Sequence, residues 1–521
     1  MLDDLLSSFH RINRYPNLDM IIVDHGSSDE SLSVIEKWAK LLPLTIVCCR
    51  RNHSFSFSCN RAAERATGEY LLLLNNDIVL SEDMIGQMIA TAARYGGIVG
   101  CKLLDADPKK GETSSVQHIG VRFKWNQRRR LSGPYDATPM AGDERIASAP
   151  SHFLAVTAAV SVCRRDDYLG VGGLCEDYLY GFEDIDLNLK LAFGWGRKNI
   201  CLNNVSAFHR GRATRQTILK HHRKDWLENN FEVFSRRFGY AVRRTILPRL
   251  FMDDGSLWGY RANVTVVSGP NHEKVRTTAQ ALGDRYHWNI RGASGYDMTA
   301  QALLIVADPC YRLECVRHRH PMMHRIAWVT SNVEQWMRHD FSIFDLVLAG
   351  DAEIADRLAK CCATAVVPLD PAAPDAADRL FTMFIEYLSA RYRIGIKNPD
   401  SGDYDVAASL ASAFRLAGHF ARIDKSAQWH CRDSIRDDIV ILMPGMRTCP
   451  PAADKIVVFG GDASADDVAV DVRLPMSDPA KLAATILDSI TSVHSRRMLG
   501  PRDRPLAECV PFDARIVPGW D

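Results

Sequence analysis

The stretch Tyr70-Leu71-Leu72-Leu73-Leu74-Asn75-Asn76-Asp77 decides the fold of the first half of this chain. Its unbroken apolar run follows Gly68 and predicts a strand that is buried on both faces. The run stops at two amides and one carboxylate, and ligands of open α/β sheets bind just beyond the carboxyl ends of the strands. A carboxylate in that place suits a divalent cation that completes its shell with phosphates and water. A strand that simply ends in a polar turn is the alternative interpretation of this stretch taken alone.

The composition is typical of a globular protein with several domains. The length of 521 residues suggests about three domains. A net charge of +1 gives no field that attracts nucleic acid, so we expect no nucleic-acid partner. The 14 cysteines have irregular spacings, which favours a reducing compartment over a zinc or disulfide framework. Without a membrane-spanning apolar run or a signal-peptide pattern, we expect a cytoplasmic protein, and peripheral association with the inner face of the membrane stays open.

The order of the predicted elements indicates a parallel sheet covered by helices. Apolar spacing predicts a helix over 2–12, a strand over 20–23, a helix over 31–41, a strand over 44–49 and a helix over 60–67 before the leucine strand. Alternation of strand and helix is typical of an α/β fold with helices on both faces of a mostly parallel sheet. The turn after the first strand has small residues and short acceptors, so a ligand can approach its backbone.

Several short motifs follow one another in a fixed order over roughly the first 235 residues. They are Val23-Asp24-His25-Gly26-Ser27-Ser28-Asp29, Arg51-Asn52 with Asn60, Gly68-Glu69-Tyr70, Leu74-Asn75-Asn76-Asp77, Val156-Thr157-Ala158-Ala159 with Arg164-Arg165, Gly172-Gly173-Leu174, Phe182-Glu183-Asp184-Ile185-Asp186-Leu187 and Phe208-His209-Arg210-Gly211. In this order the motifs resemble a family 2 glycosyltransferase with the GT-A fold. No single motif is specific, and the order carries the resemblance.

The resemblance implies a role for each matching residue. Asp184 would be the catalytic base and Glu183 a second catalytic residue beside it, while Asp77 and His209 would hold a divalent metal, Mn²⁺ or Mg²⁺, on the diphosphate of the donor. The donor would be a nucleotide sugar. Its binding residues would be Asp24, Gly26, Ser27, Asn60, Asn75 and Asn76.

The chemistry of sugar transfer needs these residue types. Charge grows on the departing diphosphate, where a metal ion offsets it. The attacking hydroxyl needs a base. Glu183 and Asp184 precede an apolar set at helical spacing, so we expect them in the first turn of a helix. Successive residues differ by about 100° around a helix, so one acid faces the acceptor and the other binds backbone or sugar. Asp186 is expected to be structural, and imidazole favours manganese. Acids placed there only for the helix dipole are the alternative.

Two further features of the first half carry expectations. The resemblance implies a strand and loop before the first helix, but Met1 falls directly at that helix. Either the given start is late or the sheet lacks an element, and a missing strand would expose edges and lower stability and donor affinity. Residues 116–125 are expected to form a hairpin or lid beside the acceptor site.

The pattern of strands and helices in the second half predicts two Rossmann-like lobes. Two of its segments, Phe344–Leu348 and Pro475–Leu499, resemble a GT-B glycosyltransferase. The second half has neither a dense Gly-rich phosphate loop nor a glutamate-centred donor motif, so we expect a non-catalytic or undetermined role. The expected organisation is a GT-A domain over 1–240 with its first strand missing, a linker over 241–261, lobes over 262–390 and 391–500, and a tail over 501–521.

The sequence therefore predicts an enzyme of bacterial surface-glycan assembly. We expect it to move a sugar, with inversion, from a nucleotide sugar to a hydroxyl of a polysaccharide or lipid-linked glycan. Two alternatives stay open: a non-catalytic carbohydrate-binding or scaffold protein with a degenerate transferase fold, and an activity that resides in the C-terminal half.

Overall fold

The computed structural model divides the chain into two compact units, and each is described by itself. The first comprises Met1–Lys124, Gly133–Phe234 and Ser495–Asp521, and the second comprises Trp125–Ser132 and Ser235–His494. The structure describes residues 1–50, 52–105, 114–126, 131–136, 146–178, 181–210, 228–242, 244, 262–269, 272–293, 303–311, 324–339, 341, 344–360, 362, 366–399, 402–425, 437–446, 455–460, 470–498 and 509–511. Most of the expected linker over 241–261 and most of the expected tail lie outside the described residues.

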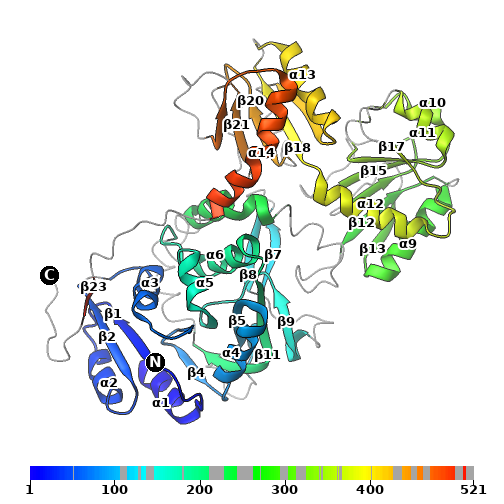
Figure 1. Ribbon diagram of the computed structural model, residues 1–521. Helices are drawn as coiled ribbons and strands as arrows, with labels where there is room; N and C mark the ends of the chain where they lie inside the picture. The colour runs from blue at the N-terminus through cyan, green and yellow to red at the C-terminus, as the bar shows by residue number, and fades with distance from the viewer. Residues whose placement is uncertain are drawn as a thin grey trace. The chain divides into compact units, whose positions relative to one another are not determined.

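The first unit alternates strands and helices, as Figure 1 shows. Its first six elements are α1 (Leu2–Ile12), β1 (Met20–Asp24), α2 (Ser31–Trp38), β2 (Leu44–Cys49), α3 (Phe55–Arg65) and β3 (Tyr70–Leu74). The next are β4 (Ile78–Leu80), α4 (Ile85–Tyr95), β5 (Gly96–Asp105), β6 (Val116–His118), β9 (Pro150–Phe153), β10 (Val160–Arg164), α5 (Arg165–Gly170), α6 (Glu183–Leu189) and β11 (Lys198–His209). The boundary between the units falls within β7 (Val121–Asn126) and within β8 (Leu131–Asp136).

The strands of the first unit form two main sheets. β1 and β2 pair in parallel, and β23 (Cys509–Pro511) adds to β2. The larger sheet has seven strands with the central order β3-β10-β5-β11-β4, and β6 and β9 pair at its sides. Within it β5 and β11 run parallel, whereas β10 enters antiparallel between β3 and β5. The antiparallel entry of β10 was not visible in the β-α-β order of the first 80 residues, because β10 comes much later in the chain.

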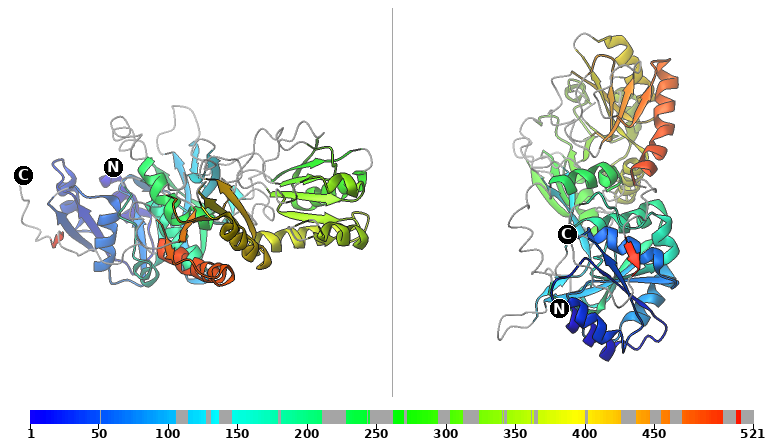
Figure 2. Two further views of the ribbon diagram at one scale, coloured as in Figure 1. Left: turned by 90° about the horizontal axis from the view of Figure 1, so that it is seen from above. Right: turned by 90° about the vertical axis from the view of Figure 1, so that its left-hand side faces the viewer.

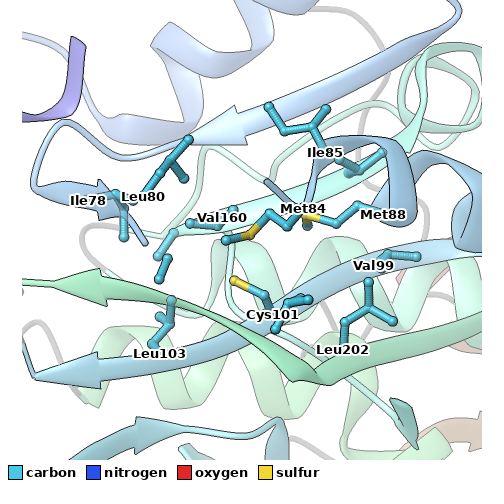
Figure 3. Close-up of a cluster of buried hydrophobic side chains, with 14 of the residues drawn as sticks. Ile78, Leu80, Met84, Ile85, Met88, Val99, Cys101, Leu103, Val160 and Leu202 are labelled. Carbon is cyan, nitrogen blue, oxygen red and sulfur yellow. The ribbon is translucent and has the colours of Figure 1, made fainter. Parts of the chain in front are cut away.

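The central strands β5, β10 and β11 of the larger sheet bury side chains on both faces, whereas the leucine strand β3 buries Leu71 and Leu73 on one face and only partly buries Leu72 and Leu74 on the other. Side chains alternate along a strand, so Leu71 and Leu73 pack with α3, α5 and α6 on one face, and Val99 and Cys101 pack with α1 and α4 on the other. Figure 3 shows the second core, in which Met84, Ile85 and Met88 meet the strands. This two-sided packing fixes the direction in which β3 delivers the residues that follow it.

The second unit contains two parallel sheets with helices, which Figure 2 shows from two further directions. The first sheet has the order β13-β12-β14-β15-β16-β17 and the second the order β19-β18-β20-β21-β22. The first lobe comprises β12 (Asn263–Val267), α9 (Glu273–Tyr286), β13 (Asn289–Ala293), β14 (Leu303–Val306), β15 (His324–Val329), α10 (Val333–Trp336), β16 (Leu346–Ala349), α11 (Ala352–Ala359), β17 (Val366–Pro368) and α12 (Ala376–Ala390). The second comprises β18 (Arg393–Asn398), α13 (Tyr404–Leu416), β19 (Phe420–Lys425), β20 (Ile439–Leu442), β21 (Ile456–Gly460), β22 (Val472–Leu474) and the start of α14 (Pro479–Met498).

These sheets confirm the α/β fold class and the Rossmann-like character of the second half. Every described strand pair in the two sheets is parallel. The two lobes meet at a buried ion pair, in which the Arg393 guanidinium donates to both carboxylate oxygens of Asp345 at 3.0 Å. None of the helices in the described part of the chain has the length and apolar character needed to cross a membrane.

Candidate functional site

The end of β3 and the end of β11 bring Asp77 and His209 together. β4 starts directly after Asp77 and pairs antiparallel with β11, so that Ile78 lies opposite His209. The Arg210 N–H donates to the Asp77 carbonyl at 3.1 Å. His209 Nε2 then lies 3.4 Å from Asp77 Oδ1, and each side chain is 19% exposed. Strand register thus places a carboxylate and an imidazole, 132 positions apart in the chain, side by side at the edge of the sheet.

The donor set of this pair fits a divalent cation. An oxygen and an imidazole nitrogen suit Mn²⁺, and neighbouring ligands of an octahedral ion lie about 3 Å apart, close to the spacing of the two atoms. The described residues contain no group of three or more histidine, cysteine or acidic side chains placed to hold a metal. A cation bound here would therefore need further ligands from a diphosphate and water, as Mg²⁺ ions on nucleotide substrates commonly do.

Gln117 on β6 makes two hydrogen bonds to His209. Its Nε2 donates to the His209 carbonyl at 2.9 Å, and its Oε1 lies 3.1 Å from His209 Nδ1. β6 reaches this position by pairing with β5, which also pairs with β11. No local pattern in the sequence connects Gln117 with a histidine 92 residues further on.

The acid pair opens α6, as its spacing predicts. Phe182, the residue before the helix, has a positive φ of 77°, a conformation that is uncommon for a bulky residue and is found at functional sites. Asp184 accepts the Ala158 N–H with Oδ2 at 3.1 Å and the Ile185 N–H with Oδ1 at 2.8 Å. An ionised carboxylate is an acceptor only, so two N–H donors match that form of Asp184.

Glu183 is held in a different electrostatic environment from its neighbour. Burial, followed by the negative charge of Asp184, raises the pKa of Glu183 to about 8. Its Oε2 is buried, and no described residue gives it a hydrogen-bond partner. Neighbouring carboxyl groups with such different surroundings are a common arrangement in sites that transfer protons.

The segment Ala158–Ala159 links the acid pair to the end of the leucine strand. Ala158 donates to Asp184, and the next residue, Ala159, accepts the Asn75 N–H at 2.9 Å. The Oδ1 of Asn75 is buried without a hydrogen-bond partner among the residues that the structure describes, and Asn76 is exposed. One backbone-to-carboxylate hydrogen bond and one backbone–backbone hydrogen bond therefore connect the Asp77 and Asp184 ends of the site within the first unit.

Asp186 belongs to the core, in agreement with its expected structural role. It is fully buried, and its carboxylate lies 3.5 Å from Lys190 Nζ and accepts the Tyr178 hydroxyl at 3.1 Å. The Tyr178 hydroxyl and the bond from Lys190 Nζ to the Gly173 carbonyl tie this buried pair to the segment before α6, so the helix that begins with the acid pair is fixed in place.

Asp24, Gly26 and Ser27 form a tight turn at the end of β1. The Asp24 carboxylate accepts the Gly26 N–H at 3.0 Å, the Ser27 N–H at 3.2 Å and the Ser27 hydroxyl at 2.5 Å. Gly26 has a φ of 74°, in the left-handed region that glycine adopts at little cost. The Asp24 carboxylate stabilises the turn, and the backbone of the turn is the part that a ligand can contact.

Asn60 is committed to the loop after α5. Its Nδ2 donates to Leu174 O and to Glu176, and its Oδ1 accepts the Leu174 N–H and the Tyr168 hydroxyl, all between 2.7 and 2.9 Å. These four bonds use the two donors and two lone pairs of the amide. Gly173 permits the contact, because a Cβ there would lie 2.3 Å from Asn60 Oδ1. Among the described contacts Asn60 shapes the site by positioning this loop.

Comparison with known proteins supports the interpretation of the ordered motifs. The model of the family described as Glycosyl transferase family 2 matches residues 1–150. The O-antigen biosynthesis protein RfbC of Myxococcus xanthus is 29% identical over 228 residues, which cover 42% of this chain and 17% of RfbC. The chain thus spans only a minor part of the length of this relative.

Two solved structures are similar to part of the chain. The crystal structure of GalNAc-T7 with UDP, GalNAc and Mn²⁺ has a TM-score of 0.33 and 14% identity, covering 52% of this chain and 48% of that chain. The mannosyltransferase PcManGT from Pyrobaculum calidifontis, in complex with GDP-Man and Mn²⁺, has a TM-score of 0.30 and 19% identity, covering 44% and 59%.

The first unit is an α/β domain in which acidic side chains lie at or just after the ends of two strands. Residues 1–150 match the model of glycosyl transferase family 2, and this match supports a glycosyltransferase domain at the N-terminus of this chain. The family and the fold class predicted from the ordered motifs are thereby confirmed.

Proposed function

We propose that the first unit transfers a sugar from a nucleotide-sugar donor to a hydroxyl of a bacterial surface polysaccharide or lipid-linked glycan, with inversion. The observation that carries this proposal is the 3.4 Å approach of His209 Nε2 to Asp77 Oδ1 at the carboxyl end of the leucine strand. A carboxylate and an imidazole at that edge form half of a cation shell, and a donor diphosphate supplies the other half.

Asp77 and His209 hold Mn²⁺ or Mg²⁺ on the diphosphate in this proposal. A cation held by these two residues would offset the negative charge that grows on the departing nucleoside diphosphate. The turn made by Asp24, Gly26 and Ser27 offers backbone to the nucleotide, while Asn75 and Asn76 lie next to Asp77 on the donor side. Asn60 acts through the loop that it holds.

Asp184 accepts the proton of the acceptor hydroxyl. Its two backbone donors fix the carboxylate in one orientation and match its ionised form, which a base requires. The raised pKa of Glu183 keeps its carboxyl largely protonated at neutral pH, so only one of the two neighbours carries charge. A neutral Glu183 can donate a hydrogen bond to the acceptor while Asp184 takes the proton.

The polysaccharide or lipid-linked acceptor is proposed because RfbC, a relative of the first unit, is named for O-antigen biosynthesis. A peripheral position at the inner face of the membrane would give access to such an acceptor. The second unit is proposed to have no part in the transfer step.

A panel of nucleotide sugars tests the proposal. The full chain is incubated with each donor in Mn²⁺ or in EDTA, and released nucleoside diphosphate is measured by chromatography, because a transferase can also pass its sugar to water. We expect at least one donor to release nucleoside diphosphate in Mn²⁺, and we expect EDTA to abolish this release. Release that is equal in EDTA would contradict the metal part of the proposal, and no release from any donor, with or without glycan acceptors, would contradict the whole.

A further inference from the structure

The contacts of Gln117 determine which nitrogen of His209 carries the proton. The His209 carbonyl oxygen can only accept a hydrogen bond, so the Gln117 amide nitrogen must face it, at 2.9 Å. This fixes the orientation of the amide and turns its oxygen, Oε1, toward His209 Nδ1 at 3.1 Å. Because an amide oxygen is only an acceptor, Nδ1 must be the protonated ring nitrogen.

The other ring nitrogen then faces Asp77 with a lone pair. A neutral imidazole has one N–H, so a proton on Nδ1 leaves Nε2 as an acceptor. Nε2 lies 3.4 Å from Asp77 Oδ1, which also accepts only. In this neutral form both atoms are acceptors with no mutual attraction, and a cation can bind both of them at once.

We propose that Gln117 is a positioning residue that holds His209 in the Nδ1–H tautomer and so presents Nε2, beside Asp77, as a ready metal ligand. This inference rests on the proposed function, in which Asp77 and His209 bind the cation of the donor complex. Residues that fix the tautomer of a ligating histidine commonly contribute 10- to 100-fold to metal affinity, as an order of magnitude.

β6 is the element that makes the arrangement possible. It pairs with β5 on the edge opposite to β11, alongside the same end of β5, so that Leu104 lies between Val116 of β6 and Phe208 of β11, and Asp105 lies opposite His209. The two hydrogen bonds of Gln117 span main chain and ring of one residue, so they fix the orientation of the imidazole as well as its proton. The segment after β5 therefore serves the metal end of the site.

Two substitutions separate this role from a purely structural one. Gln117→Leu removes both hydrogen bonds. Gln117→Glu keeps an acceptor for the Nδ1–H but loses the donor to the His209 carbonyl. If Gln117 acts on the tautomer, Glu should replace it and Leu should not. If it only ties β6 to β11, both variants should fail alike. Gln87→Leu and Gln87→Glu, on the exposed face of α4, are matched controls.

The tautomer is measured first, in metal-free full-length protein at pH 8. Histidine-selective ¹⁵N NMR gives separate signals for protonated and unprotonated ring nitrogens, and the spectrum of His209→Asn identifies those of His209. We expect Nδ1–H in the wild type and in Gln117→Glu, and a shift toward Nε2–H in Gln117→Leu. Nε2–H in the wild type, or an unchanged tautomer in Gln117→Leu, would overturn the inference.

Mn²⁺ affinity is measured next, by electron paramagnetic resonance with Mn²⁺ alone and with Mn²⁺ plus UDP. We expect Gln117→Leu to weaken binding about 10-fold or more, with Gln117→Glu and both Gln87 variants close to the wild type. Equal losses in both Gln117 variants, or no loss in either, would overturn the inference while the metal site of the proposed function stands. A wild type that binds no Mn²⁺ under either condition would overturn both.

Discussion

His209 Nε2 lies 3.4 Å from Asp77 Oδ1, and this contact brings together the last residue of β11 and the carboxylate that follows the leucine strand. It depends on the register of β4 and β11, which sets Ile78 opposite His209. A slip of one residue in that register would turn the imidazole to the other face of the sheet. The geometry of the proposed donor site therefore depends on the register in which β4 pairs with β11.

Asp77→Ala should remove metal-dependent binding of nucleoside diphosphate. The substitution deletes the carboxylate half of the Asp77–His209 pair and leaves the β4–β11 pairing in place. Isothermal titration calorimetry of UDP and GDP with Mn²⁺ should show affinity reduced by about 100-fold or more, in line with the loss of a direct ligand. Asp166→Ala, which removes a largely exposed acid from α5, is the control and should bind as the wild type does. Unchanged Mn²⁺-dependent binding in Asp77→Ala would exclude Asp77 as a ligand.

Glu183→Gln should change how stability depends on pH. The pKa of Glu183 is raised from 4.5 to about 8, so its contribution to stability is complete below about pH 4.5 and is lost as pH rises through about 8. Glutamine does not ionise, so the variant loses no stability in this way. Between pH 5 and pH 8 the free energy of unfolding of the variant should therefore rise relative to that of the wild type by roughly 2 to 4 kcal/mol, as measured by thermal melts recorded at each pH.

The control for this comparison is Glu232→Gln, which alters an exposed glutamate in the same unit. Its melting temperature should differ from that of the wild type by the same small amount at every pH. A Glu183→Gln difference that is also constant with pH would mean that Glu183 ionises as an ordinary exposed carboxyl does.

Asn60→Ala should destabilise the first unit and loosen the loop at Gly173 and Leu174. The substitution leaves the buried Tyr168 hydroxyl and Leu174 N–H without the acceptor that Asn60 supplies, which costs about 1–3 kcal/mol for each unsatisfied group. Asn76→Ala removes an exposed amide and should stay within about 0.5 kcal/mol of the wild type. Urea unfolding followed by hydrogen exchange of peptides from this loop measures both, and equal stability of the two variants would contradict the role given to Asn60.

Arg393→Met should weaken the second unit where its two lobes meet. The substitution removes the guanidinium from the buried Asp345 carboxylate, which keeps its contacts with the Arg325 N–H and the neighbouring His324, and breaking one side of a buried ion pair costs roughly 3–5 kcal/mol. Hydrogen exchange should accelerate in β15, β16 and β18. Arg285→Met breaks the exposed pair with Asp378 in the same unit and should cost less than about 1 kcal/mol. Similar exchange in both variants would mean that the buried pair adds no stability.

Much of the fold was predictable from local pattern. The leucine run, the strand over 44–49 and the acid pair at a helix start all depend on residues close together in the chain, and the structure has each of them. The antiparallel entry of β10 and the two-sheet division of the first unit depend on pairings between distant segments. Hydrophobic periodicity contains no information about such pairings.

The site shows the same division. Asp77 could be predicted because a carboxylate after a buried strand has a local signature. The link between Gln117 and His209 requires β6, β5 and β11 in one register, and no short motif records it. The hydrogen bonds that commit Asn60 to the loop at Leu174 span 114 residues, and they were equally invisible in the sequence.

The most direct test of the account compares Asp184→Asn with the wild type on the donor that the nucleotide-sugar panel identifies. Both transfer to an acceptor and Mn²⁺-dependent donor binding are measured on the full chain. We predict that transfer falls by at least about 100-fold, the scale of a lost general base, while donor affinity stays within about threefold of the wild type. Transfer at the wild-type rate would contradict the central claim and place the activity outside the Glu183–Asp184 site.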